Sequence, residues 1–147
     1  MKPSERVVLD LMSRDVLSLR EDQDVQHLIE TMKLFEFRHL TVTDEGRLVG
    51  LITQRDVLRI SASSLLPNAR EQTEHLSKKW KVRDVMTRGV KTVKPTTTLV
   101  EAARILDADK VGCLPVVDDD NALCGIITDS DFLKLTIELL EHPEEHS

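Results

Sequence analysis

The sequence predicts an α/β (α+β) fold that contains two tandem copies of one β-α-β-β-α unit. A shift of 74 residues superposes 8–44 on 82–118, and one inserted residue in a polar turn then superposes 48–58 on 123–133. The hydrophobic period changes in the same order in both copies, from strand to helix, then to two strands and a second helix. Leu, Ile, Val and Phe supply 46 of the 147 residues, which is enough to form a hydrophobic core.

Each copy is expected to begin with a short strand, at Val16–Leu19 in the first and Val90–Val93 in the second. A helix follows, because apolar residues recur at helical spacing from Asp24 in one copy and after Thr98 in the other. Asp24 is the expected N-cap of the first of these helices. Each helix therefore has one apolar face to bury.

A β-hairpin and a second helix complete each copy. The expected strands are Leu40–Val42 with Leu48–Thr53, and Leu114–Val117 with Leu123–Thr128. Polar turns separate the two strands of each hairpin. The closing helices should begin at Gln54 and Asp129. A threonine precedes each of these residues and can cap the first turn.

The predicted organisation follows from these boundaries. Repeat one occupies 8–60 and repeat two occupies 82–138. The more polar stretch 61–81 is expected to combine a helical extension with a linker, and 139–147 is a charged tail.

Composition and motifs exclude several classes of protein. The chain has 26 acidic and 20 basic residues, a net charge of -6 and only 3% aromatic residues, which argues against nucleic-acid binding. No apolar run approaches a membrane span, and no secretory signal is recognisable, so we expect no membrane partner and a cytoplasmic location. The spacing of the cysteines and histidines suits no metal site, and no motif activates a nucleophile or water. We expect a non-enzymatic protein without a metal or resident cofactor.

Two Thr-x-x-Asp pairs at strand-to-helix junctions are the candidate functional residues. Thr53 with Asp56, and Thr128 with Asp131, place a hydroxyl and a carboxylate three residues apart. Such a carboxylate can accept hydrogen bonds from two vicinal hydroxyls, as on a ribose, and the helix N-terminus offers N–H groups to a phosphate. The structural alternative is helix capping without any ligand.

The duplicated motifs resemble those of the paired CBS domain, or Bateman module. Both copies close on Gly-apolar-apolar-Thr-x-x-Asp, at Gly50–Asp56 and Gly125–Asp131. Both open on Asp-x-Met-Ser/Thr, at Asp10–Ser13 and Asp84–Thr87, and Leu114–Asp118 fits the family as well. The resemblance spans residues 8 to 138 and implies that the two repeats pack around a pseudo-twofold axis.

The resemblance also implies two ligand clefts between the repeats. Cleft one would use Leu51, Thr53, Arg55 and Asp56 with Thr87, Lys91, Val111 and Gly112. Cleft two would use Ile126, Thr128, Ser130 and Asp131 with Ser13, Leu17, Phe37 and Arg38. The aspartates would bind the ribose and the threonines the sugar or α-phosphate. The backbone of Leu17 or Lys91 would face the adenine, and the side chains of Phe37 and Val111 would pack against the base.

The two implied clefts differ in charge. Gly112 stands where the first copy has Arg38, and Ser130 stands where it has Arg55, so the phosphate-binding charge is uneven. We therefore expect one cleft to bind a nucleotide clearly better than the other.

The family resemblance implies a stand-alone regulatory protein. Its ligand would contain adenosine, with AMP, ADP or ATP favoured, and it would form a homodimer and act on an unknown partner protein in trans. S-adenosylmethionine and NADH remain alternative ligands. The alternative function is a structural dimerisation or protein-interaction module whose clefts are vestigial.

Overall fold

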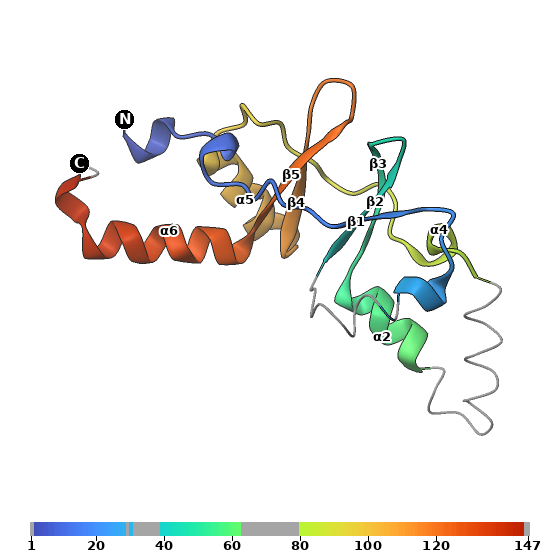
Figure 1. Ribbon diagram of the computed structural model, residues 1–147. Helices are drawn as coiled ribbons and strands as arrows, with labels where there is room; N and C mark the ends of the chain where they lie inside the picture. The colour runs from blue at the N-terminus through green and yellow to red at the C-terminus, as the bar shows by residue number, and fades with distance from the viewer. Residues whose placement is uncertain (1, 29, 31–38, 63–79, 146–147) are drawn as a thin grey trace. The chain divides into compact units, whose positions relative to one another are not determined.

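The computed structural model describes residues 2–28, 30, 39–62 and 80–145 (Figure 1). The chain divides into two compact units. We call Leu17–Val90 the central unit, and Met1–Val16 together with Lys91–Ser147 the terminal unit. Each unit takes its hairpin from one repeat and the opening segment, which carries the Asp-x-Met motif, from the other.

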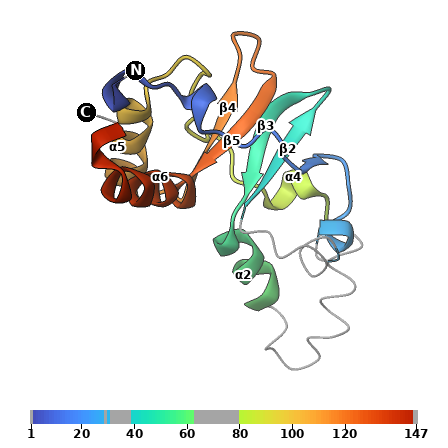
Figure 2. The same ribbon diagram turned by 60° about the vertical axis from the view of Figure 1, so that its left-hand side comes forward.

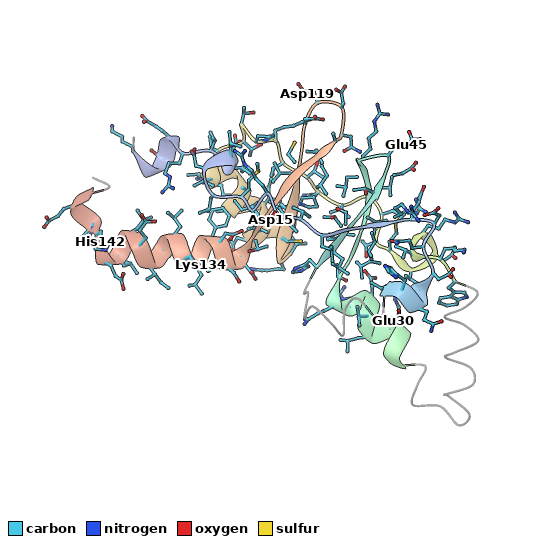
Figure 3. The ribbon with its side chains drawn as sticks, viewed as in Figure 1. Asp15, Glu30, Glu45, Asp119, Lys134 and His142 are labelled. Carbon is cyan, nitrogen blue, oxygen red and sulfur yellow. The ribbon has the colours of Figure 1, made fainter. Side chains whose placement is uncertain are left out.

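A three-stranded sheet forms the framework of the central unit. β1 (Ser18–Arg20) runs parallel to β2 (Leu40–Asp44), which pairs antiparallel with β3 (Arg47–Ile52). Glu45 and Gly46 have φ angles of 50° and 81°, as a two-residue type I′ hairpin turn requires. Glu45 is seen at the tip of this hairpin in Figure 3. The predicted hairpin is therefore confirmed in this unit.

Helices cover this sheet and complete the core of the central unit. Residues 25–28 are helical, α2 spans Gln54–Ala62 and the short α4 spans Val82–Val85. The carboxylate of Asp24, the expected N-cap, accepts a hydrogen bond of 2.7 Å from Lys81 Nζ. The buried core consists of Leu19, Val25, Leu28, Leu40, Val42, Ile52, Val82, Val85 and Met86. The opening segment of repeat two therefore supplies three of the residues that fill the core under the hairpin of repeat one.

The terminal unit repeats this plan. Its hairpin consists of β4 (Cys113–Val117) and β5 (Leu123–Thr128), and β5 leads directly into α6 (Asp129–Glu141), which lies beside α5 (Leu99–Asp109) in both ribbon views (Figures 1 and 2). Three short 3-10 turns, η1 (Pro3–Glu5), η2 (Val8–Asp10) and η4 (Pro143–Glu145), lie outside these elements. The core consists of Val8, Val93, Leu99, Ala102, Leu106, Leu114, Val116, Ile127 and Leu135.

The opening strands differ most from the prediction. β1 begins at Ser18, two residues after the expected start, and the expected strand 90–93 is reduced to one parallel bridge between Val93 and Val116. Pro115 stands where the first repeat has Thr41, and it has no N–H to donate to a longer ladder. Thr41, by contrast, adds a side-chain hydrogen bond of 3.2 Å to the carbonyl of Leu17.

Candidate functional site

The Thr-x-x-Asp pair of the central unit lies where β3 ends and α2 begins. The Thr53 N–H and Oγ1 both donate to Asp56 Oδ2, at 2.9 and 3.0 Å, and the Asp56 N–H donates to Thr53 Oγ1 at 3.3 Å. This reciprocal arrangement is a capping box, which satisfies N–H groups that an α-helix leaves unpaired at its start.

The pair of the terminal unit has the same geometry between β5 and α6. The Thr128 N–H and Oγ1 donate to Asp131 Oδ2 at 2.8 and 3.1 Å, and the Asp131 N–H donates to Thr128 Oγ1 at 3.3 Å. The capping role weighed from the sequence is therefore present in both units. It uses one carboxylate oxygen, Oδ2, of each aspartate.

The opening segments reach these junctions by pairing with the hairpins. In the central unit, Leu51 and Thr87 exchange two backbone hydrogen bonds of 3.0 and 2.8 Å. In the terminal unit, Ser13 and Ile126 exchange two bonds of 2.9 Å each. The predicted residues Leu51, Thr53, Asp56 and Thr87 thus lie together in the central unit, and Ser13, Ile126, Thr128 and Asp131 lie together in the terminal unit.

The glycine of each closing motif allows this close approach. A Cβ on Gly125 would lie 2.6 Å from the Ser13 carbonyl oxygen and 2.9 Å from Met12 Sδ. A Cβ on Gly50 would lie 2.5 Å from Met86 Sδ and 3.1 Å from the Thr87 carbonyl oxygen. The glycine and the opening methionine therefore belong to one packing arrangement.

The aspartates of the opening motifs cap the turns that carry those methionines. Asp10 Oδ2 accepts from the Val7 N–H at 2.9 Å, and Asp84 Oδ2 accepts from the Lys81 N–H at 2.9 Å. Each fixes a short helical turn just before the segment that reaches the junction.

Asp56 has two further partners. Thr87 Oγ1 lies 3.0 Å from its Oδ2 and 3.3 Å from its Oδ1, and Arg59 Nη2 donates to Oδ1 at 2.5 Å. The same Nη2 lies 3.3 Å from the carbonyl oxygen of Val85. The Asp56 side chain is only 4% exposed, whereas that of Arg59 is 67% exposed.

Sequence reasoning did not select Arg59. Its spacing of three residues from Asp56 on a helix is a signal that could have identified it. In repeat two the equivalent position is Lys134, which is exposed on α6 (Figure 3).

The other residues predicted for the two clefts are not brought together at the two Thr-x-x-Asp junctions. Arg55 and Ser130 are exposed in the first turns of α2 and α6, and the Ser130 N–H donates to Asp129 Oδ1 at 2.8 Å. Phe37 and Arg38 lie outside the described residues. Leu17 is 40% exposed and belongs to the central unit, not to the unit of Asp131. Its place in a cleft stays a prediction.

Three residues predicted for the Asp56 cleft belong to the terminal unit. Lys91 pairs with Asp109 at 2.7 Å. Val111 and Gly112 line a hollow of about 550 Å³ beside α5 and α6, whose full lining is Ala103, Leu106, Asp107, Lys110, Val111, Gly112, Asp129 and Phe132. Their part in binding at Asp56 also stays a prediction.

The described residues contain no group of three or more His, Cys, Asp or Glu side chains arranged to hold a metal ion. Among the same residues, no helix is long and apolar enough to cross a membrane. Cys113 is buried and Cys124 partly buried, and both are free thiols. Burial, with a smaller contribution from the nearby Asp129 carboxylate, raises the pKa of the Cys113 thiol to about 12, so it is not a reactive nucleophile near neutral pH.

Known proteins share this architecture. A CBS domain-containing protein of Dictyostelium discoideum is 32% identical over 136 residues, which cover 92% of this chain and 94% of that protein. CBSX2 of Arabidopsis thaliana, solved in complex with AMP, is 28% identical with a TM-score of 0.76, and the match covers 91% of this chain and 98% of that one.

The CBS domain pair of protein MJ0100, solved with 5′-methylthioadenosine and S-adenosylmethionine, is 26% identical with a TM-score of 0.70, and the match covers 90% of this chain and 96% of that one. Other curated relatives are longer, and the chain spans 46% of one and 23% of another. The CBS domain family model matches twice, at residues 8–63 and 82–138. The chain therefore belongs to the CBS domain family and carries a tandem CBS pair.

Proposed function

We propose that this CBS pair is a regulatory sensor that binds an adenosine-containing nucleotide, with AMP, ADP or ATP as the favoured ligand. The observation that carries the proposal is the hydrogen bonding of the two oxygens of the Asp131 carboxylate. Oδ2 is used by the capping box, whereas Oδ1 accepts no hydrogen bond from any residue that the structure describes. An oxygen that no described donor contacts, in a partly exposed side chain, suits the two vicinal hydroxyls of a ribose.

The surroundings of Asp131 suit the rest of a nucleotide. The junction is the N-terminus of a 13-residue helix, α6, where the helix dipole favours a negatively charged phosphate. The capping box fixes Thr128 beside the Asp131 carboxylate, so these two side chains are already ordered before a ligand binds. CBS-pair proteins are generally regulatory, which supports a sensor at this junction.

Two relatives support an adenosyl ligand. CBSX2 was solved with AMP, and the MJ0100 pair with S-adenosylmethionine and 5′-methylthioadenosine. All three ligands share the adenosine moiety and its ribose hydroxyls. S-adenosylmethionine therefore remains the second candidate, and NADH the third.

We further propose that the protein forms a homodimer and regulates a partner protein. α6 exposes an apolar stripe at helical spacing, formed by Leu133, Ile137 and Leu140, which are 62%, 48% and 76% exposed. Burying this stripe against a second copy would remove it from water. If the protein dimerises but binds no ligand, the alternative function applies, namely a structural dimerisation or protein-interaction module.

The test is thermal unfolding of the wild type, Asp56→Ala and Asp131→Ala with AMP, ADP, ATP, S-adenosylmethionine and NADH. A ligand that binds only the folded state at a hundred times its Kd stabilises that state by about 2.7 kcal/mol. We expect a rise in Tm with one adenine nucleotide that Asp131→Ala abolishes. No rise with any compound, in protein free of co-purified nucleotide, would support the interaction module instead.

A further inference from the structure

We propose that Arg59 competes with the ligand for the Asp56 carboxylate. Asp131 is then the carboxylate that is available to a ribose, whereas Asp56 is occupied by the Arg59 side chain. This inference rests on the proposed function, because it concerns which of the two carboxylates receives the ribose. It starts from the difference between two aspartates that share the same local motif and the same capping box.

The hydrogen-bonding capacity of the two carboxylates differs. A carboxylate offers about four lone-pair sites. Asp56 is contacted by four donor groups: the Thr53 N–H, the Thr53 hydroxyl, the Thr87 hydroxyl and Arg59 Nη2. Among the described residues, Asp131 is contacted by only two, and both lie on Oδ2. A ribose must therefore displace existing donors at Asp56, whereas no described donor occupies Oδ1 of Asp131.

Arg59 is the strongest of these competitors. Its contact with Oδ1 is a charge-assisted hydrogen bond, and the second contact of Nη2, with the Val85 carbonyl, holds the guanidinium over the carboxylate. The burial of Asp56, 4% exposed, limits access further. Because Arg59 itself is 67% exposed, water and salt weaken the pair, and a ligand can displace it at a cost in affinity.

In the described part of the chain, repeat two makes neither of the two added contacts. Lys134 replaces Arg59 and carries one ammonium group in place of the planar fork of arginine. Ser13 replaces Thr87, and within the described part of the chain its hydrogen bonds are the two backbone bonds to Ile126. The difference between the two carboxylates thus coincides with two substitutions between the repeats, Arg59 to Lys134 and Thr87 to Ser13.

The experiment measures AMP binding by isothermal titration at 0.15 M salt, with Asp131→Asn as the background that isolates the Asp56 site. Adding Arg59→Gln to Asp131→Asn should raise the affinity for AMP about three- to tenfold, the range expected for removing a partly exposed, charge-assisted hydrogen bond. Adding Asp56→Asn as well should abolish that binding. The matched control is Arg47→Gln in the same background, which removes one exposed positive charge from β3 of the same unit and should change nothing.

A second variant tests the inference even if Arg59→Gln does not fold. Lys134→Arg introduces the same i,i+3 pair at Asp131 and should weaken AMP binding to otherwise wild-type protein about threefold. The inference is overturned if Arg59→Gln leaves or lowers the affinity of the Asp56 site, or if Asp56→Asn alone abolishes wild-type binding. If neither the wild type nor any variant binds AMP or another compound of the panel, the proposed function itself fails and the inference fails with it.

Discussion

Replacing Gly125 with alanine should destabilise the terminal unit, and by more than the equivalent change at Gly50. The new Cβ at Gly125 would lie 2.6 Å from the Ser13 carbonyl oxygen. That oxygen belongs to the backbone and accepts the Ile126 N–H at 2.9 Å, so it cannot move away without stretching the pairing that fixes the opening segment. At Gly50 the nearest atom is the sulfur of Met86, a flexible side chain, and the backbone oxygen of Thr87 is 3.1 Å away.

The expected loss in the free energy of unfolding combines three contributions. Overpacking a closely packed site costs about 1–3 kcal/mol, and weakening the Ser13–Ile126 hydrogen bond costs up to about 1 kcal/mol. The lower entropy of the unfolded chain with alanine returns about 0.4–1 kcal/mol. Because the nearest neighbour at Gly125 is rigid backbone, the overpacking cost there should lie near the top of its range, which gives a net loss of about 2–3 kcal/mol. The net loss at Gly50, where the methionine can adjust, should be about 1 kcal/mol.

Urea unfolding of the wild type and the two alanine variants, followed by far-UV circular dichroism, measures both losses. The thermal counterpart at Gly125 is a fall in Tm of about 5–9 °C for a chain of this size. A loss below about 0.5 kcal/mol at Gly125, or an equal loss at both glycines, would refute the argument that the backbone of Ser13 is the rigid neighbour.

Further predictions concern the cap, the thiols and the proposed dimer. Thr128→Val should lower stability by about 1 kcal/mol in urea unfolding, since it removes the hydroxyl that accepts the Asp131 N–H; no change would show that the cap is dispensable. Cys124 should react with Ellman's reagent before Cys113 at pH 8. Because folding raises the pKa of Cys113 from 9.0 to about 12, stability should be constant below about pH 9 and fall as the pH rises towards 12, a slope that Cys113→Ala should remove. If α6 forms the proposed homodimer, Ile137→Asp should halve the mass measured by light scattering; an unchanged mass would place any dimer contact elsewhere.

Local patterns in the sequence predicted much of the fold. The expected starts of α5 and α6 agree with the structure, and so do the threonines before them, since the Glu101 N–H donates to Thr98 Oγ1 at 3.2 Å. These features depend on residues three or four positions apart, which a pattern along the chain records directly. The expected helix from Asp24 continues into residues that the structure does not describe.

Contacts between distant parts of the chain were harder to predict. Val8 is completely buried in the core that also contains Leu114, and Val82 is completely buried in the core that contains Leu40. The repeat aligns Val8 with Val82 but does not show that each packs under the hairpin of the other repeat. The contact of Arg59 with the Val85 carbonyl escaped prediction for the same reason, because 26 residues separate the two along the chain.

Capping and ligand binding, weighed as alternatives from the sequence, are compatible in this geometry. The capping box of α6 uses Oδ2 of Asp131, and a ribose needs acceptor sites that Oδ1 can provide. The cap also holds the carboxylate in one orientation, which lowers the entropy that binding must remove. A Thr-x-x-Asp motif can therefore be structural in both repeats and functional in one. Under the proposed function, the donors around Oδ1 separate the two roles, and in repeat one that donor is Arg59, which contacts Oδ1 of Asp56.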